Sequence, residues 1–436
     1  MYLYAKGIKP NRRSCMRTVS KTVIGVDFGT QSARAVLVNA ENGEIIYSCR
    51  KEYPYNSTPV PAIDCAENLP CATDYEMTLY ELLRNVIPEE YRKTVAGICI
   101  DATSLTMVLL AEDGRALSEL DGWSEAAHAR VKLWKYHRAQ EKADEALNLA
   151  SNLQEPFLGR TGGSISCEWM LPKLLEVRDE APEIYSKIDL AMDLCEFLTF
   201  RLTGQLVRSI GSLSYKCLWA EDLSFPERTF LNGLRAGFYE EYCHFLRGDV
   251  RKPGECAGML RSELTKRWGL PEQIPVATGM LDGHTSLATM GAFEPGDAAL
   301  IVGTSNVCTV QDRKLQELKD VCGVAQEGMV TGSCGIDTGQ SSTGNMLGWF
   351  VEHMAGWQIH REAEERKISP HQVLAERIQK PWENKVIAVD WWSGSRNAPC
   401  DLTLRGSMSG LEMDTKTEDI YLALLQAIAC GTGTIL

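Results

Sequence analysis

The sequence predicts an α/β fold with two lobes, each opening with two strands that are joined by a turn rich in glycine and hydroxyl side chains. The length of 436 residues is too great for one ordinary hydrophobic core, so two domains are expected. One such turn, 27–32, follows the apolar run 23–26, and a second, 303–306, follows the run 299–302. A lone aspartate, Asp282, precedes the second turn. Together these observations predict a strand–turn–strand unit in each half of the chain.

The composition describes a folded protein with an acidic surface. Hydrophobic residues make up 44% and charged residues 24% of the chain, and 45 basic against 58 acidic side chains give a net charge of −13. This charge argues against nucleic acid or an anionic membrane as the main partner. No apolar run approaches the roughly 18 residues that a membrane span needs. The 15 cysteines include no Cys-x-x-Cys pair, which is typical of reduced thiols in a cytoplasmic enzyme.

The first 21 residues differ from the rest of the chain. They contain six basic residues and no acidic one, and they lack the apolar core of a secretory signal. A targeting peptide stays open. The expected alternatives are that residues 1–21 form a disordered tail, or that Met16 is the true start.

In the first half, the pattern alternates between strands and helices. The hydrophobic spacing and the positions of Gly, Pro and Asn predict the elements in order. They are a β-hairpin over 22–38, a strand over 44–50, an irregular loop over 55–73, a helix over 73–86, a buried strand over 95–101 and a strand over 106–110. Helices are then expected over 126–149, 169–177 and 191–202, and Gly204 ends the last of them. A strand over 275–281 delivers Asp282 at its carboxyl end, where α/β sheets place their chemistry.

Past Gly291 the strand–turn–strand pattern starts again, which fits an internally duplicated α/β fold of the actin–hexokinase–Hsp70 type, the two-lobed actin-like or ribonuclease H-like ATPase fold. We expect a first lobe over 22–292 and a second over 293–436. Near the end, Thr415 and Glu418 form a capping box for a helix over 420–429. No strand follows this helix before Leu436, so the second lobe is expected to be incomplete.

The first turn has the residue types that phosphoryl transfer requires. The protein must hold Mg²⁺, grip the leaving phosphates and aim a hydroxyl at the γ-phosphorus. Asp27 suits Mg²⁺, which favours carboxylate oxygens and retained water. Gly29 lets the backbone approach a phosphate, and Thr30, Gln31 and Ser32 add donors. The alternative is an ordinary hairpin in which Asp27 only caps the turn.

The second turn and the lone aspartate extend this interpretation. Gly303, Thr304 and Ser305 can offer donors to the β-phosphate from the opposite wall of a cleft. Asp282 is the candidate general base, a role that contributes typically about 10²–10⁴-fold. Its alternative role is a helix N-cap, which is compatible because a helix N-terminus keeps a carboxylate ionised. His284 has no second His or Cys at ligand spacing, so we expect it to be a packed or exposed residue. Asp27, Asp282 and Gly303 are predicted to converge on one crevice.

From Thr22 to its last residue the chain resembles the FGGY family of carbohydrate kinases. The motif Asp27-Phe28-Gly29-Thr30 is similar to the first phosphate motif of the family, and 406–411 with 419–426 fit its second signature. Several stretches resemble the ribulokinases within this family. They are 128–135, 155–158, 166–173, Tyr215-Lys216-x-x-Trp219 and 339–341. An actin- or Hsp70-like ATPase does not need the stretches 128–135 and 166–173.

The resemblance implies ATP- and Mg²⁺-dependent phosphorylation of a ketopentose in the cytoplasm, with L-ribulose to L-ribulose 5-phosphate as the first expectation. Two alternatives stay open: another sugar kinase of the family, acting on D-ribulose, xylulose or a polyol, and an inactive sugar-binding relative. A homodimer also stays open. Lys216, Asp282 and the region of Ser104 would line the sugar pocket, with Asp282 as the base. Where ribulokinases carry a glutamate, this chain has the shorter Asp337, which puts the choice among pentuloses in question. The adenine-binding glycine loop of the family would lie beyond Leu436.

Overall fold

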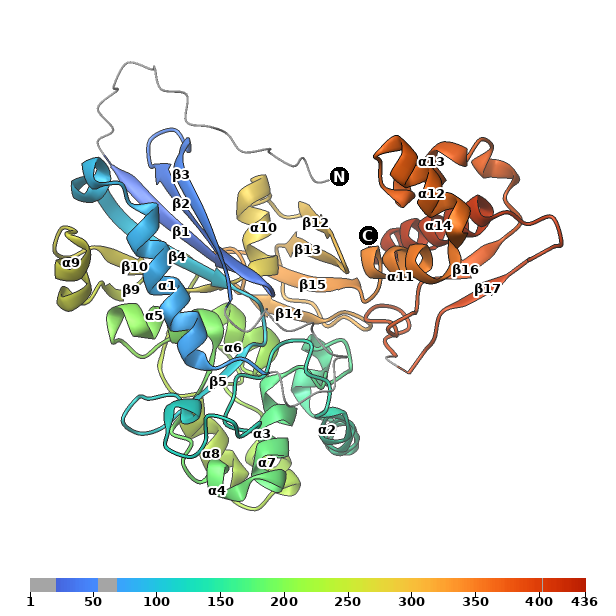
Figure 1. Cartoon of the computed structure of the whole chain (residues 1–436). Coiled ribbons are helices and arrows are strands. Elements are labelled where there is room, and N and C mark those ends of the chain that lie inside the picture. Colours follow the sequence, from blue (N-terminus) through green and yellow to red (C-terminus); the bar gives the residue numbers. More distant parts are fainter. Residues whose placement is uncertain (1–20, 54–68, 402) are drawn as a thin grey trace.

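The computed structural model describes residues 21–53, 69–401 and 403–436. The expected N-terminal tail, apart from Lys21, and most of the predicted loop over 55–73 lie outside these residues. The architecture is the predicted two-lobed α/β fold (Figure 1). In the described part of the chain, no helix combines the length and apolar character that crossing a membrane would require.

The first lobe is built on a seven-stranded sheet with the order β3-β2-β1-β4-β10-β9 and with β11 beside β4. Its strands are β1 Thr22–Phe28, β2 Ser32–Asn39, β3 Ile45–Glu52, β4 Val95–Ala102, β9 Cys256–Met259, β10 Pro275–Ala277 and β11 Met280–Leu281. β1 and β2 form the predicted antiparallel hairpin, whereas β1 and β4 run parallel. The inner strands alternate buried and partly exposed residues, which is why these apolar runs form a sheet with helices against it.

Helices and short strands complete the first lobe. α1 (Ala72–Val86) and α5 (Leu194–Thr203) pack with the sheet around one hydrophobic core, and a second core lies among the helices on the far side of α5. The other helices are α2 Gln140–Leu153, α3 Met170–Glu180, α4 Pro182–Tyr185, α6 Ile210–Lys216, α7 Arg228–Leu234, α8 Phe238–Phe245 and α9 Ser262–Trp268. The strands β5 Met107–Leu110 and β6 Leu190–Asp193 pair with each other, as do β7 Val207–Ser209 and β8 Asp249–Arg251. Single 3₁₀ turns are η3 Glu89–Thr94, η4 Leu117–Glu119 and η5 Pro156–Arg160.

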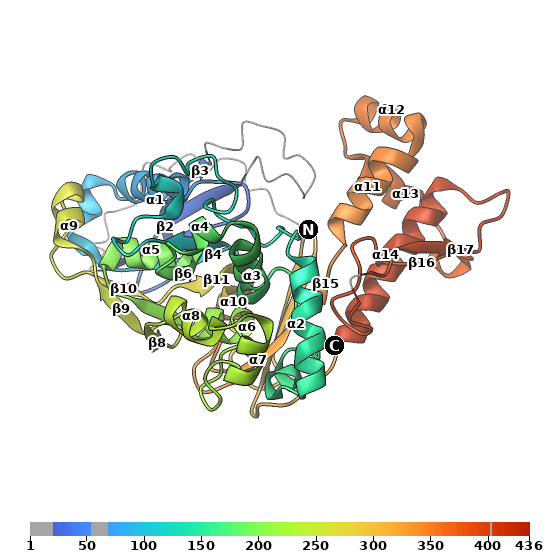
Figure 2. The same cartoon turned by 90° about the horizontal axis from the view of Figure 1, so that it is seen from below.

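The second lobe starts with a four-stranded antiparallel sheet of order β12-β13-β15-β14, which lies beside α10 (Asp282–Met290). Its strands are β12 Ala298–Val302, β13 Asn306–Asp312, β14 Gly323–Gln326 and β15 Cys334–Gln340. The remaining elements are α11 Gly344–Met354, α12 Gly356–Arg366, α13 Pro370–Arg377, η6 Pro381–Glu383, β16 Ile387–Val389, β17 Ser407–Ser409 and α14 Thr417–Ile435. Figures 1 and 2 show this last group, in orange and red, projecting from the body of the molecule at the end of β15.

The helix predicted over 126–149 is wrong in its first half, because α2 begins only at Gln140. Residues before it form turns and an extended bridge. The backbone of Lys132 exchanges two hydrogen bonds with Met107, with N···O distances of 2.9 and 3.1 Å. This tertiary pairing removes the backbone groups that an α-helix would use.

Three other predicted boundaries also moved. The helix predicted over 191–202 begins at Leu194, because the preceding residues pair with β5 and the Asp193 carboxylate caps the Leu194 N–H at 2.8 Å. The strand predicted over 275–281 is interrupted at Thr278, whose N–H donates to the Glu255 carbonyl at 2.8 Å instead of to the sheet. The capping box predicted at Thr415 lies one residue later, where the Asp419 carboxylate accepts the Lys416 N–H at 2.9 Å.

Candidate active site

Three carboxylates meet at the carboxyl ends of neighbouring parallel strands. Asp27, in β1, stands opposite Asp101 in the register of β1 and β4. On the other side of β4, Met280 of β11 also stands opposite Asp101, and Asp282 follows directly after β11. Because parallel strands end at the same edge of a sheet, the chain brings these three acids into one place from three distant segments.

Burial, with like charges nearby, raises the pKa values of the acids in this cluster. Burial, with the neighbouring charges of Asp27 and Asp282, raises the pKa of Asp101 to about 8. Burial also raises the pKa of Asp27, although a hydrogen bond to Asp101 opposes this, and it raises the pKa of Asp282 to about 6. One oxygen of Asp101, Oδ1, is buried without a hydrogen-bond partner. The charges of Arg34 and Lys216 oppose these increases at Asp27 and Asp282 but do not cancel them.

A divalent cation fits these observations. Among residues 21–53, 69–401 and 403–436, no three His, Cys, Asp or Glu side chains are arranged to hold a metal by themselves. Mg²⁺ does not need such a cage, since it is usually held by one or two carboxylates together with water and substrate phosphates. The like-charged acids and the unpartnered Asp101 oxygen provide this kind of partial site.

A cavity of about 430 Å³ is lined by residues of both lobes, and its lining includes Asp282 but neither Asp27 nor Asp101. Its lining combines predicted residues of both lobes with residues that the sequence did not single out. The predicted residues are Thr30, Ser104, Lys216, Asp282, Thr304, Ser305 and Asp337. Gly29, Gln31, Ser32 and Gly303 belong to the same two turns but do not line the cavity.

A buried ion pair joins the lobes at the base of this cavity. Lys216 Nζ, at the end of α6, lies 3.0 Å from Asp337 Oδ2, in β15. Both residues are buried, at 6% and 7% exposure. Burial alone would raise the pKa of Asp337, but Lys216 and His284 outweigh it and hold that pKa well below its usual value. Burial likewise opposes the charge of Lys216, yet the Asp337 carboxylate raises its pKa, so both groups stay charged.

His284 is a site residue that the sequence reasoning missed. It was expected to be packed or exposed, and it is buried, but it also lines the cavity with Nε2 3.5 Å from Asp337 Oδ2. Its ring packs edge-on against Tyr215, with centroids 4.7 Å apart, and its Nδ1 has no hydrogen-bond partner. Burial lowers the pKa of His284, so the neutral ring donates toward Asp337. The sequence feature that could have identified His284 is its position two residues after Asp282, in the first turn of the same helix.

Asp282 is the first residue of α10, whose N-cap is Leu281, so the expected N-cap role lies one residue away from the observed position of Asp282. Its Oδ1 accepts the Gly283 N–H at 2.7 Å, and Ser104 lines the same cavity. The helix N-terminus favours the ionised carboxylate, whereas burial favours the protonated form. A pKa near 6 leaves Asp282 ionised at neutral pH and basic enough to accept a proton.

Both predicted turns contribute residues to the cavity lining, Thr30 from the first and Thr304 and Ser305 from the second. In the first, the Gly29 N–H donates to the Ser32 carbonyl at 3.1 Å, and Thr30 Oγ1 accepts the indole N–H of Trp134 at 3.1 Å. In the second, the Gly303 N–H donates to the Ser305 carbonyl at 3.1 Å. A Cβ on residue 344 would come within 2.4 Å of the Gly303 carbonyl, so the chain packs tightly behind this turn.

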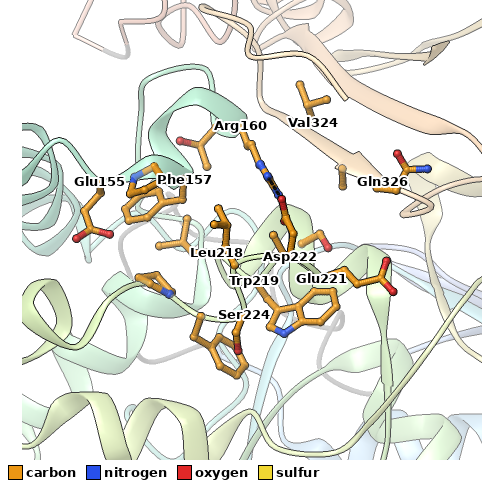
Figure 3. A pocket seen from close by; sticks show the side chains of 18 of the residues that line it. Glu155, Phe157, Arg160, Leu218, Trp219, Glu221, Asp222, Ser224, Val324 and Gln326 are labelled. Carbon is orange, nitrogen blue, oxygen red and sulfur yellow. Dashed lines mark hydrogen bonds and ion pairs between the residues drawn. The ribbon is translucent and has the colours of Figure 1, made fainter. Parts of the chain in front are cut away.

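A second cavity, of about 440 Å³, lies between η5, the loop that follows α6, and β14 (Figure 3). Phe157 and Trp219 contribute apolar surface, and Arg160 forms two hydrogen bonds of 2.8 and 2.7 Å with Asp222. None of the predicted site residues lines it. Of these two cavities, the first is the one that combines Asp282 with residues of the two predicted turns.

Comparison with known proteins agrees with this geometry. Residues 22–289 match the N-terminal domain of the FGGY family of carbohydrate kinases, and residues 298–436 match its C-terminal domain. A ribulokinase from Halalkalibacterium halodurans is 33% identical over 426 residues, covering 95% of this chain and 76% of the relative. A ribulokinase from Mycolicibacterium smegmatis is 36% identical over 431 residues, with 95% and 76% covered.

Solved structures show the same fold. The crystal structure of a gluconate kinase from Lactobacillus acidophilus superposes with a TM-score of 0.76 at 19% identity, covering 95% of this chain and 77% of the other. The family models together span nearly all of the described residues, and the two relatives exceed 30% identity over most of their own length. This protein therefore belongs to the FGGY family of carbohydrate kinases.

Proposed function

We propose that this carbohydrate kinase transfers the γ-phosphoryl group of ATP to the terminal hydroxyl of a ketopentose, with L-ribulose as the substrate and L-ribulose 5-phosphate as the product. The observation that supports this most directly is the placement of Asp282 and the Lys216–Asp337 pair in one cavity between the lobes. The curated relatives described above carry the name ribulokinase, which favours ribulose over other sugars.

In this mechanism each residue has a defined role. Lys216, Asp337 and the backbone near Ser104 bind sugar hydroxyls and carbonyl oxygen, because an ammonium donates and a carboxylate accepts. Asp282 accepts the proton of the attacking sugar hydroxyl. The oxygen of that hydroxyl forms a bond to the γ-phosphorus. The bond between that phosphorus and the β–γ bridging oxygen breaks, and ADP leaves with the bridging oxygen.

The turns and Asp27 serve the nucleotide. Thr30, Thr304 and Ser305 line the cavity and offer hydroxyl or backbone donors to phosphate oxygens, with Gly29, Gln31, Ser32 and Gly303 shaping the two turns. Asp27 would hold Mg²⁺, alone or through water, and the bound ion would neutralise charge on the phosphates. Closure of the lobes would exclude water from the reacting phosphorus.

A panel of sugars tests the substrate. In a coupled assay of ADP formation, L-ribulose is expected to give the highest kcat/KM, ahead of D-ribulose, D-xylulose, glycerol and ribitol. A preference for a polyol would overturn the ribulose assignment. Calorimetric titration that shows sugar binding but no binding of MgATP would overturn the kinase role itself.

The pH dependence of kcat/KM for the sugar is expected to report Asp282. A base must be deprotonated to act, and this ratio reports the enzyme before sugar binds. With the pKa of Asp282 raised by burial to about 6, activity should be constant near neutral pH and fall tenfold per pH unit well below 6. Initial rates at constant ionic strength between pH 4.5 and 8 measure this. A profile that stays flat down to pH 4.5 would exclude Asp282 as the base.

A further inference from the structure

The turn that carries Ser104 into the active-site cavity has an unusual conformation at its next residue. Leu105 has a φ of 62°, in the left-handed region that residues with a Cβ seldom adopt. Its side chain is buried and lines the cavity. A conformation of this kind persists only where the surrounding structure holds it, and such positions gather at functional sites.

Two buried charged side chains hold both backbone groups of Leu105. Its N–H donates to Asp193 Oδ2 at 3.0 Å, and its carbonyl accepts a hydrogen bond from Lys173 Nζ at 2.7 Å. Lys173 and Asp193 are each 0% exposed, and neither lines the cavity. They come from α3 and from the end of β6, two elements that are separate from the catalytic strands.

Lys173 also holds the segment that precedes Trp134, another residue of the cavity lining. Its ammonium donates to the carbonyls of Leu133 at 2.9 Å and Lys132 at 3.3 Å. The next residue, Trp134, lines the cavity and donates its indole N–H to Thr30 in the first phosphate turn. One buried ammonium therefore fixes two wall segments with respect to each other.

Asp193 connects the same turn to the helix that carries Lys216. Its Oδ2 accepts a hydrogen bond from Ser212 Oγ, in α6, at 3.2 Å, in addition to the Leu105 N–H. Its Oδ1 accepts the Leu194 N–H at 2.8 Å and so caps α5. Both oxygens of Asp193 thus accept hydrogen bonds, while burial beside Glu196 raises the pKa of this carboxyl group to about 7.

We propose that Lys173 and Asp193 are positioning residues, which clamp the 104–105 turn so that Ser104 is held in the wall of the cavity that Asp282 also lines. This inference rests on the proposed function for its consequence in catalysis. If the turn relaxes, the wall of the cavity around Ser104 and Leu105 loses its fixed position.

Lys173→Met, in the whole protein, tests the clamp. We expect kcat/KM for ribulose to fall about tenfold, while KM for MgATP stays within twofold. Lys132→Met is the matched control, because Lys132 is equally buried but, in the described part of the chain, its Nζ contacts the side chains of Glu176, Tyr136 and His128 and no backbone carbonyl. The control should lose stability with a smaller fall in kcat/KM. An unchanged kcat/KM in Lys173→Met would overturn the clamp.

Hydrogen exchange of the peptide over 103–107 tests the clamp independently of turnover. Lys173→Met is expected to speed exchange there at least tenfold, and Lys132→Met is not. Asp193→Asn provides a second variant if Lys173→Met does not fold, because an amide must place its NH₂ against one of the N–H donors that Asp193 accepts. If Lys173→Met speeds exchange but the wild-type protein has no ribulose kinase activity, the clamp is retained and the proposed function is rejected. Unchanged exchange in the folded variants would reject the clamp while the kinase function could stand.

Discussion

Asp282→Asn is expected to reduce kcat for ribulose phosphorylation by roughly 10²–10⁴-fold, the usual contribution of a positioned general base. The amide keeps the volume of the carboxyl group and can still accept the Gly283 N–H, which the wild-type Oδ1 does at 2.7 Å. It has no capacity to take the hydroxyl proton. Coupled assays of ADP formation at saturating ribulose and MgATP measure this fall in kcat.

Measurement of ribulose binding distinguishes a loss of the chemical step in Asp282→Asn from a loss of the folded structure. Calorimetry should give a dissociation constant for ribulose within about tenfold of the wild-type value in Asp282→Asn, since Lys216 and Asp337 remain. Asp113→Asn is the control, because this carboxylate lies in an exposed turn with Arg115 as its partner. Turnover of Asp282→Asn within tenfold of the wild type would remove Asp282 from the role of base.

Lys216→Met is expected to have the largest effect on stability and to abolish measurable sugar binding. Removing one partner of a buried ion pair leaves the other charge uncompensated, at a cost of about 3–5 kcal/mol. It also removes the ammonium proposed to donate to the sugar, and a hydrogen bond to a charged group contributes about 1.5–3 kcal/mol. Urea unfolding and ribulose titration measure the two effects separately.

The destabilisation by Lys216→Met should depend on pH in a defined direction. In the wild type, Lys216 and His284 hold the folded pKa of Asp337 below its unfolded value, so the stabilisation is present above that unfolded value and is lost as the pH falls. Without Lys216, burial favours the protonated carboxyl, and protonation then stabilises the folded state. The loss of unfolding free energy should therefore be smaller at pH 5 than at pH 8. An equal loss at both values would show that Asp337 is not left as an unpaired buried charge.

A double variant distinguishes the two roles of the pair. Lys216→Met with Asp337→Leu replaces both charges by apolar groups and should recover most of the stability, but it should not recover ribulose binding. Lys252→Met is the matched control, since Lys252 and Glu327 also form an ion pair between the lobes but at the surface. The Lys252→Met variant should keep nearly the wild-type free energy of unfolding. Recovery of ribulose binding in the double variant would contradict the sugar-contact role.

Local pattern was sufficient for much of the framework. The hairpin of β1 and β2, the strand β4 and the helix α1 lie within a residue or two of their predicted ranges, because alternating burial and clear turn residues leave few alternatives. The segment 126–139 failed for the opposite reason. Its apolar spacing resembles a helix, but its backbone is used by Met107, a partner that no local window contains.

The roles of Asp101 and His284 show where sequence reasoning reached its limit. Asp101 was recognised only as the end of a strand. Its raised pKa arises from burial and from the acidic neighbours Asp27 of β1 and Asp282 of α10. His284 has no candidate partner nearby in the sequence, because its partner Asp337 belongs to the other lobe. The pairing of Lys216 with Asp337 also crosses the lobes, although the family resemblance had assigned both residues to the sugar.

The sequence by itself determined the α/β class, the two strand–turn–strand units, the family and the chemical types gathered for phosphate and sugar, since these depend on short-range periodicity and on residue identity. Only the tertiary structure decided which charges meet: the acids at the sheet edge, the ion pair between the lobes and the buried clamp behind Ser104. Electrostatic interaction depends on separation in space and on burial, and folding fixes both by joining segments that lie far apart along the chain.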